Sequence, residues 1–264
     1  MKRHVQRHIR VAIAASLACT CLILAAAAWA AQATQTLSVR ASFTPDRLGT
    51  PTNLSASAVF GPAGPGPQSP AIKVTAYGPA GMLVDTRGAG VCTVTPAKLE
   101  ATGPRACPAS SRIGFGAGVG LFEIAHELLP GPLALEFFLA PSEHGHLAVL
   151  IYVSAVTPAS EQLAFMGHEV RAHSPYGIGI TFDIPIVPTL PGASLGWVQH
   201  VSLTFGAHGI AYYRTVHGRR RLQRVRGVVT PKSCPRGGFP IEVRVGFADG
   251  TATATTTTVP CPAR

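Results

Sequence analysis

The chain has 264 residues and carries 22 lysines and arginines against 12 aspartates and glutamates, which gives a net charge of +10. A chain of this length can bury enough surface to fold around its own core, so its stability requires neither a metal nor a cofactor. The twelve acidic residues are scattered along the chain, which leaves the paired carboxylates of a glycoside hydrolase without support.

The N-terminal segment has the composition of a secretory signal. Four cations without an acidic residue precede an apolar run, Val11–Ala28, and two small-x-small sites follow, ending at Ala30 and Ala33. This order predicts a signal peptide over residues 1–33 and therefore a secreted or extracytoplasmic protein with no transmembrane span after cleavage. The alternative is a retained anchor helix, because the apolar run approaches the ~20 residues that cross a bilayer.

Four cysteines remain after the predicted signal: Cys92, Cys107, Cys234 and Cys261. An even number in an exported chain indicates two disulfides, for which three pairings exist. We expect the local pairing, Cys92–Cys107 and Cys234–Cys261, because each pair encloses one compact segment. A zinc site is the alternative, but the chain lacks the C-x-x-C spacing typical of one.

Apolar residues alternate with polar ones along most of the predicted mature chain. This period of two is typical of strands, and the first example places Leu37, Val39, Ala41 and Phe43 on one face. An Asp249-Gly250 pair predicts a hairpin turn near the C-terminus, and only residues 95–103, with Thr95 as a cap, resemble a helix. The strands are expected within residues 36–43, 53–60, 71–77, 112–124, 132–140, 146–156, 161–173, 177–184, 196–208 and 239–259.

These elements predict the fold class. Ten to twelve short strands and one short helix indicate an all-β protein, an antiparallel β-sandwich of jelly-roll-like type. The absence of long helical periods argues against a parallel βαβ fold. We expect one domain over residues 34–264, with two packed sandwiches as the alternative.

A glycine run in residues 112–124 invites comparison with nucleotide-binding loops. Gly114, Gly116, Gly118 and Gly120 alternate with apolar residues. A dinucleotide fingerprint needs G-x-G-x-x-G between a strand and a helix, and a P-loop needs a following lysine; neither condition is met. We interpret the run as a strand whose bare face lets a neighbouring element approach closely.

The segment Gly192–Gly196 matches the G-x-S-x-G pattern of hydrolases around Ser194. That motif functions on a strand-turn-helix with a histidine further along the chain. Here a strand pattern follows, and no histidine comes after Asp249. We therefore predict a turn rather than a nucleophile.

Histidines are the other candidates for chemistry. His144 and His146 would share a face if they lay on a strand, and His168 and His173 lie in a later predicted strand. With carboxylates from the earlier segment Glu123–Glu127, which contains His126, they offer ligands for Zn²⁺ or Cu²⁺. We favour the interpretation that these are surface histidines and that the protein has no metal or other cofactor.

The strongest charge feature is a cluster of five arginines within eight residues. A cluster of this kind binds phosphates or carboxylates on anionic polymers. Nucleic acid is not expected, because the chain is predicted to be exported and the cluster lacks interleaved aromatic residues; anionic envelope polymers, lipid headgroups or surface proteins suit the compartment. The alternative is a solvated hairpin whose charges prevent edge-to-edge pairing. The cluster consists of Arg219, Arg220, Arg221, Arg224 and Arg226.

Three further stretches of the chain are "TPDRLGTPTNL", "ACPASSRIGFGAG" and "SCPRGGFPIEVRVGFADGTATATTTTVPCP". Together they resemble a group of uncharacterised secreted proteins of actinobacteria. The resemblance implies export, two local disulfides and a β-sandwich, and it supplies no activity or catalytic residue. The arginine cluster and the His144/His146 pair fall outside the shared pattern.

Two functions follow as hypotheses. The first is an exported, non-enzymatic β-sandwich of the cell envelope or extracellular space that acts as a structural or binding module. The alternative is an extracellular hydrolase or metal-dependent enzyme that uses the His144/His146 region.

Overall fold

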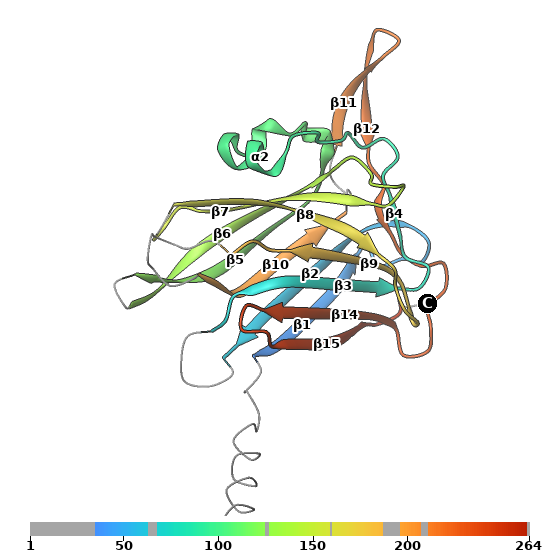
Figure 1. Cartoon of the computed structure of the whole chain (residues 1–264). Helices are drawn as coiled ribbons and strands as arrows, with labels where there is room; N and C mark the ends of the chain where they lie inside the picture. Colours follow the sequence, from blue (N-terminus) through green and yellow to red (C-terminus); the bar gives the residue numbers. More distant parts are fainter. Residues whose placement is uncertain are drawn as a thin grey trace, which may run out of the picture. The chain divides into compact units, whose positions relative to one another are not determined.

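Antiparallel strands make up most of the structure, which confirms the all-β fold class (Figure 1). The computed structural model describes residues 35–62, 68–124, 127–158, 160–186, 196–206 and 211–262, so the predicted signal peptide lies outside the described residues. Residues from Gln35 onward form one compact unit of their own, which holds every core cluster and both disulfides. Among the described residues, no helix is long and apolar enough to cross a membrane.

The described residues form fifteen strands and one short α-helix, α2 (Pro96–Thr102). The strand count exceeds the expected ten to twelve, because several short strands lack a clear alternation over their length. The strands are β1 (Thr36–Thr44), β2 (Pro51–Gly61), β3 (Ala71–Pro79), β4 (Leu83–Asp85), β5 (Arg112–Ile124), β6 (Glu127–Leu139), β7 (Ala148–Ala155), β8 (Glu161–Val170), β9 (Tyr176–Asp183), β10 (Trp197–Phe205), β11 (Ala211–Val216), β12 (Arg219–Arg224), β13 (Gly227–Val229), β14 (Phe239–Phe247) and β15 (Ala252–Val259).

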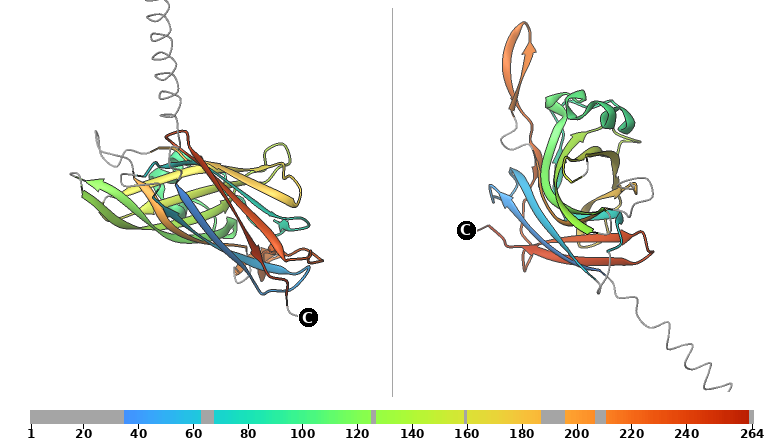
Figure 2. Two further views of the ribbon diagram at one scale, coloured as in Figure 1. Left: turned by 90° about the horizontal axis from the view of Figure 1, so that it is seen from below. Right: turned by 90° about the vertical axis from the view of Figure 1, so that its left-hand side faces the viewer.

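Thirteen strands form one sheet that folds back on itself. Its order is β15-β14-β3-β9-β8-β7-β6-β5-β10-β2-β13-β4, with β1 paired to β2. A core cluster joins Phe60 of β2 and Val201 of β10 to Val245 and Phe247 of β14. Because β2 and β10 stand far from β14 in the strand order, these contacts require two packed layers, which Figure 2 shows from two sides. The arrangement is sandwich-like.

The glycine run lies on β5, whose bounds agree with the prediction. A Cβ added to Gly116 would lie 2.8 Å from the carbonyl oxygen of Ser202 and 2.6 Å from Leu203 Cδ2, both on β10. A Cβ on Gly118 would lie 2.5 Å from the His200 carbonyl oxygen. The bare face of β5 therefore admits the backbone and side chains of its neighbour, as the close-packing interpretation predicts.

Strand β7 is buried on both faces, which its near-continuous apolar sequence indicates. Val149 and Ile151 contribute to the cluster between the layers, whereas Leu150 and Tyr152 point to the opposite side. There they pack beneath the segment that contains α2, whose Leu99 is fully buried.

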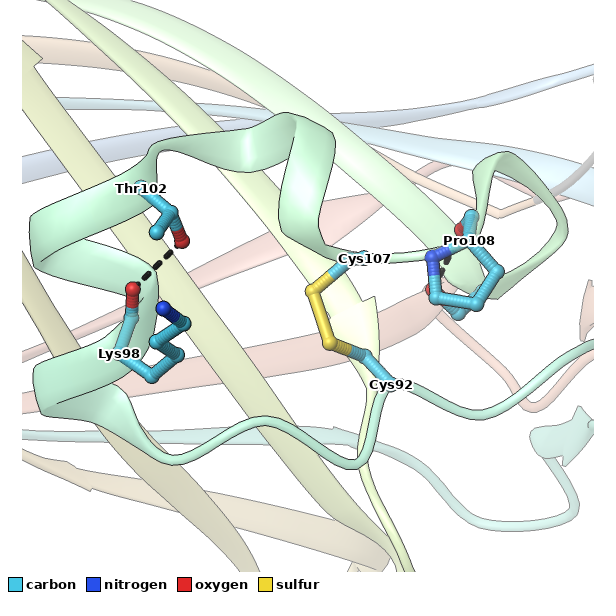
Figure 3. The surroundings of a disulfide bond; sticks show 6 residues. Cys92, Lys98, Thr102, Cys107 and Pro108 are labelled. Carbon is cyan, nitrogen blue, oxygen red and sulfur yellow. Dashed lines mark hydrogen bonds between the residues drawn. A yellow bond between two sulfur atoms is a disulfide. The ribbon is translucent and has the colours of Figure 1, made fainter.

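The first disulfide fixes that covering segment. Cys92 and Cys107 are bonded and buried, with α2 between them in sequence (Figure 3). The Thr95 hydroxyl accepts a hydrogen bond from Lys98 N at 3.3 Å, which confirms the predicted cap, and Thr102 Oγ1 donates to the Lys98 carbonyl at 2.6 Å.

The second disulfide, Cys234–Cys261, brackets the C-terminal hairpin of β14 and β15. Both predicted pairings are thus confirmed. The turn of this hairpin lies at Asp249-Gly250, as expected, and Gly250 has a φ of +83°. The Asp249 carboxylate accepts hydrogen bonds from the backbone N and the hydroxyl of Thr251, at 2.9 and 2.7 Å.

Candidate functional site

The arginine cluster lies on a two-stranded arm that stands apart from the main sheet. Strands β11 and β12 pair with each other alone and form a separate sheet. In Figures 1 and 2 this hairpin extends beyond the layers of the main sheet. Its turn is His217-Gly218, with φ values of +49° and +73°, which is the pair of left-handed residues that a tight type I′ turn requires.

Three arginines on this arm have exposed side chains: Arg219, Arg220 and Arg221. Within the described part of the chain, none of them forms an ion pair with a carboxylate. Arg220 faces the opposite side of the ribbon from Arg219 and Arg221, because successive residues of a strand alternate between faces. The arm therefore presents uncompensated positive charge on both faces.

The other two arginines of the predicted cluster differ in their placement. Arg224 is the last residue of β12. Arg226 lies beyond the arm, and its guanidinium is 3.5 Å from Asp85 Oδ2 at the edge of the main sheet. Asp85 also accepts hydrogen bonds from Arg87 Nε and one terminal guanidinium nitrogen of Arg87, at 2.8 and 2.6 Å. These hydrogen bonds, followed by the charges of Arg87 and Arg226, lower the pKa of Asp85 from 3.8 to about 2. Arg226 is thus engaged at the base of the arm.

An apolar pair accompanies the charges. Tyr213 and Leu222 are direct cross-strand partners, and 59% and 47% of their surfaces are exposed. The guanidinium of Arg220 lies 4.2 Å from the centroid of the Tyr213 ring, a cation–π contact. The two exposed apolar side chains are adjacent on one face and lie beside a cation, so the arm offers an apolar contact as well as charge.

The first two candidate histidines do not lie on a strand, so the condition for a shared face is not met. His144 and Gly145 have φ values of +52° and +83°, so they form a tight turn between β6 and β7. Glu143 and His146 close it with backbone hydrogen bonds of 3.2 and 2.8 Å. A His-Gly pair favours this turn because glycine adopts positive φ without strain, and the two histidines therefore share no strand face.

The remaining histidines lie in two different places. His168, on β8, has its Nδ1 3.2 Å from Glu143 Oε2, and His146 Nδ1 is 4.0 Å from Glu169 Oε2. His173 lies beyond the end of β8, in the loop before β9, and not within the predicted strand. The described residues contain no group of three or more histidines, cysteines or acidic residues able to hold a metal ion.

His173 belongs to a cluster that the sequence did not indicate. Its Nε2 lies 3.3 Å from Glu242 Oε2 and 3.2 Å from one terminal nitrogen of Arg244. Its ring contacts Tyr77 and Tyr176 edge-on, at centroid distances of 4.9 and 5.0 Å. Three separate parts of the chain meet here, because Tyr77 pairs with Glu242 across β3 and β14 while Tyr176, three residues after His173, begins β9.

The carboxylate of Glu242 is the centre of this cluster. Only 8% of the residue is exposed, and Arg244 Nε donates a hydrogen bond to Oε1 at 2.5 Å. That hydrogen bond lowers the pKa of Glu242, with further contributions from the charges of Arg244 and His173 and a hydrogen bond from Tyr176. The acceptor positions are taken by side chains of the protein itself. We interpret the cluster as a clamp that ties the β8–β9 loop to β14.

The structure describes only some of the other candidate residues. Ser194 and His126 lie outside the described residues. Glu123 and Glu127 lie near the adjoining ends of the paired strands β5 and β6 and not in the loop that the sequence had indicated. The structure thus brings three arginines together on the arm and separates His173 from the other candidate histidines.

Comparisons with known proteins provide no family for the chain: no family model, no curated protein and no solved structure matches it.

Tyr213 and Leu222 were not among the sequence-based candidates, although the sequence holds a signal for them. Counting outward from the His217-Gly218 turn pairs Val216 with Arg219 and, three steps further, Tyr213 with Leu222. The Glu242 clamp has no such signal, because its members come from strands that are distant in sequence.

Proposed function

We propose that this protein is an exported, non-enzymatic binding module of the cell envelope or extracellular space that attaches to anionic partners through the β11–β12 arm. The observation that carries the proposal is the set of three exposed guanidiniums, Arg219, Arg220 and Arg221, without a carboxylate partner in the described chain. The two disulfides and the N-terminal signal pattern support the extracytoplasmic location.

The arm has little reason to carry this charge for stability. A two-stranded ribbon is marginal in water by itself. Arg219 and Arg221 lie two positions apart on one face of β12, so their like charges repel each other. This arginine cluster opposes folding through its repulsion and adds nothing to core packing. A ligand of opposite charge explains why the arm carries it.

Binding to immobilised inorganic polyphosphate tests the proposal. The protein used is Gln35–Arg264, the unit that contains the described cores and disulfides. We expect binding that weakens as salt screens the charges, and an affinity about tenfold lower for R219Q/R220Q/R221Q, at ~0.5 kcal/mol for each lost contact.

The matched control is R40Q/R171Q/R236Q, which removes three exposed arginines outside the arm and gives the same net charge. This control should keep most of the affinity. Equal losses in the two variants would show a general charge effect and would contradict the role of the arm, as would the absence of any binding.

A further inference from the structure

We propose that the anionic partner of the arm is a phospholipid surface, with Tyr213 and Leu222 entering the headgroup region while the arginines contact phosphates. This inference rests on the proposed function and names its partner. The apolar pair, and not the charge, distinguishes the partner, because any polyanion would neutralise the arginines.

The pair is placed where it can enter a surface. Tyr213 and Leu222 lie opposite each other on one face of a ribbon that forms no part of the main sheet. Both keep about half of their surface exposed, 59% and 47% respectively. A soluble polyanion gives apolar side chains nothing to bury against, whereas the boundary between headgroups and acyl chains does.

The types of residue also suit such a boundary. Tyrosine has an apolar ring and a polar hydroxyl, and it is enriched where one end of a side chain is wet and the other is not. The Arg220 guanidinium, 4.2 Å from the Tyr213 ring centroid, places a cation beside the apolar pair. An inserted tyrosine would thus bring this cation to the depth of the lipid phosphates.

The position of the charges along the arm supports the same geometry. Arg219, Arg220 and Arg221 follow directly after the His217-Gly218 turn, so they lie at the free end of the hairpin. Arg226, at the other end, is held by Asp85. The free cations of the arm therefore lie where the arm would first meet a surface, which attracts cations if its lipids are anionic.

Sedimentation with lipid vesicles tests this inference. The Gln35–Arg264 unit is mixed with vesicles of phosphatidylcholine alone or of phosphatidylcholine and phosphatidylglycerol in equal parts. We expect binding to the anionic vesicles only, weakened by salt. Y213S/L222S, which keeps every charge, should bind them about tenfold more weakly, because the apolar contact is lost.

Two comparisons make the result specific. L83S/V156S removes two exposed apolar residues outside the arm, which are 61% and 76% exposed, and should bind the vesicles like the unmodified protein. Y213S/L222S should retain its affinity for polyphosphate, which depends on the arginines. A thermal melt of each variant verifies that it is folded.

The outcomes separate this inference from the proposed function. If the protein binds polyphosphate but not anionic vesicles, the partner is a soluble polymer, and the lipid inference is wrong while the proposed function stands. If Y213S/L222S binds anionic vesicles as tightly as the unmodified protein, the claim that the apolar pair enters the headgroup region is wrong. If neither probe is bound, both proposals fail.

Discussion

The Nε2 atom of His173 lies 3.3 Å from Oε2 of Glu242, although the two residues are 69 positions apart in the sequence. Glu242 is nearly buried on β14, and His173 is in the loop before β9. Arg244 donates to the same carboxylate at 2.5 Å. One acidic side chain therefore links a loop to a strand of the same layer, and its contribution to stability can be measured.

Replacing Glu242 with glutamine should destabilise the fold by about 1–3 kcal/mol, because the nearly buried carboxylate loses its charge-assisted hydrogen bonds. Urea unfolding at neutral pH measures this change. Glu143→Gln is the matched control: Glu143 also pairs with a histidine, but its side chain is 55% exposed. We expect the control to cost about 0.5 kcal/mol or less, and equal losses would contradict the clamp.

Arg87 and Arg226 lower the pKa of Asp85 from 3.8 to about 2. The ionised carboxylate therefore contributes to the stability of the fold, and this contribution is sensitive to acid. The unfolded chain binds a proton at Asp85 more readily than the folded chain, so this contribution is present above about pH 4 and is lost as the pH falls towards 2. Asp85→Asn should lower stability at neutral pH by about 1–2 kcal/mol. The variant should then lose less further stability than the unmodified protein as the pH falls below 4.

Unfolding curves across this pH range test the Asp85 prediction. Asp46→Asn, which removes an exposed carboxylate, is the control. An Asp85→Asn protein whose acid sensitivity equals that of the unmodified protein would show that the Arg87 and Arg226 contacts do not stabilise the fold.

Gly116→Ala should destabilise the protein by about 1–3 kcal/mol, because the added methyl group meets the Ser202 carbonyl oxygen and Leu203 of β10. Gly246→Ala is the control, because its Cβ would meet only Lys73 Cβ, at 3.7 Å. Thermal melts should show a clear drop in Tm for the first variant and little change for the second. Similar melting temperatures would contradict the close approach of β5 and β10.

Removing the Cys92–Cys107 disulfide should cost more than removing Cys234–Cys261, although it closes the shorter loop. The chain-entropy model gives about 3 kcal/mol for either loop. Cys92 and Cys107 are also buried against Leu99, so the double alanine variant loses core packing as well. Urea unfolding of the two double variants provides the comparison, and a larger loss for C234A/C261A would contradict it.

The sequence was sufficient for the features that depend on local chemistry. Each of these features requires only residues that are close in the chain. They are the alternation in β1 and β14, the Thr95 cap, the Asp249-Gly250 turn and both cysteine pairings. The order of strands in the sheet was not predicted, because it depends on contacts between distant segments.

The candidate histidines show where local patterns mislead. His144 and His146 have strand-like spacing, but the intervening Gly145 and the φ of +52° at His144 turn the chain instead. The Glu242 clamp was missed for a different reason. Its members lie on β3, β9, β14 and a loop, and no spacing along the chain brings them together.

Hydrogen–deuterium exchange of Gln35–Arg264, with and without polyphosphate, tests most directly whether the β11–β12 arm is the contact site. Backbone amides of a marginal two-stranded ribbon exchange readily, so a bound ligand should slow them clearly. We predict protection confined to residues 211–226 and much weaker in the R219Q/R220Q/R221Q variant at the same polyphosphate concentration. Protection elsewhere in the sheet with an unchanged arm would contradict the proposed function.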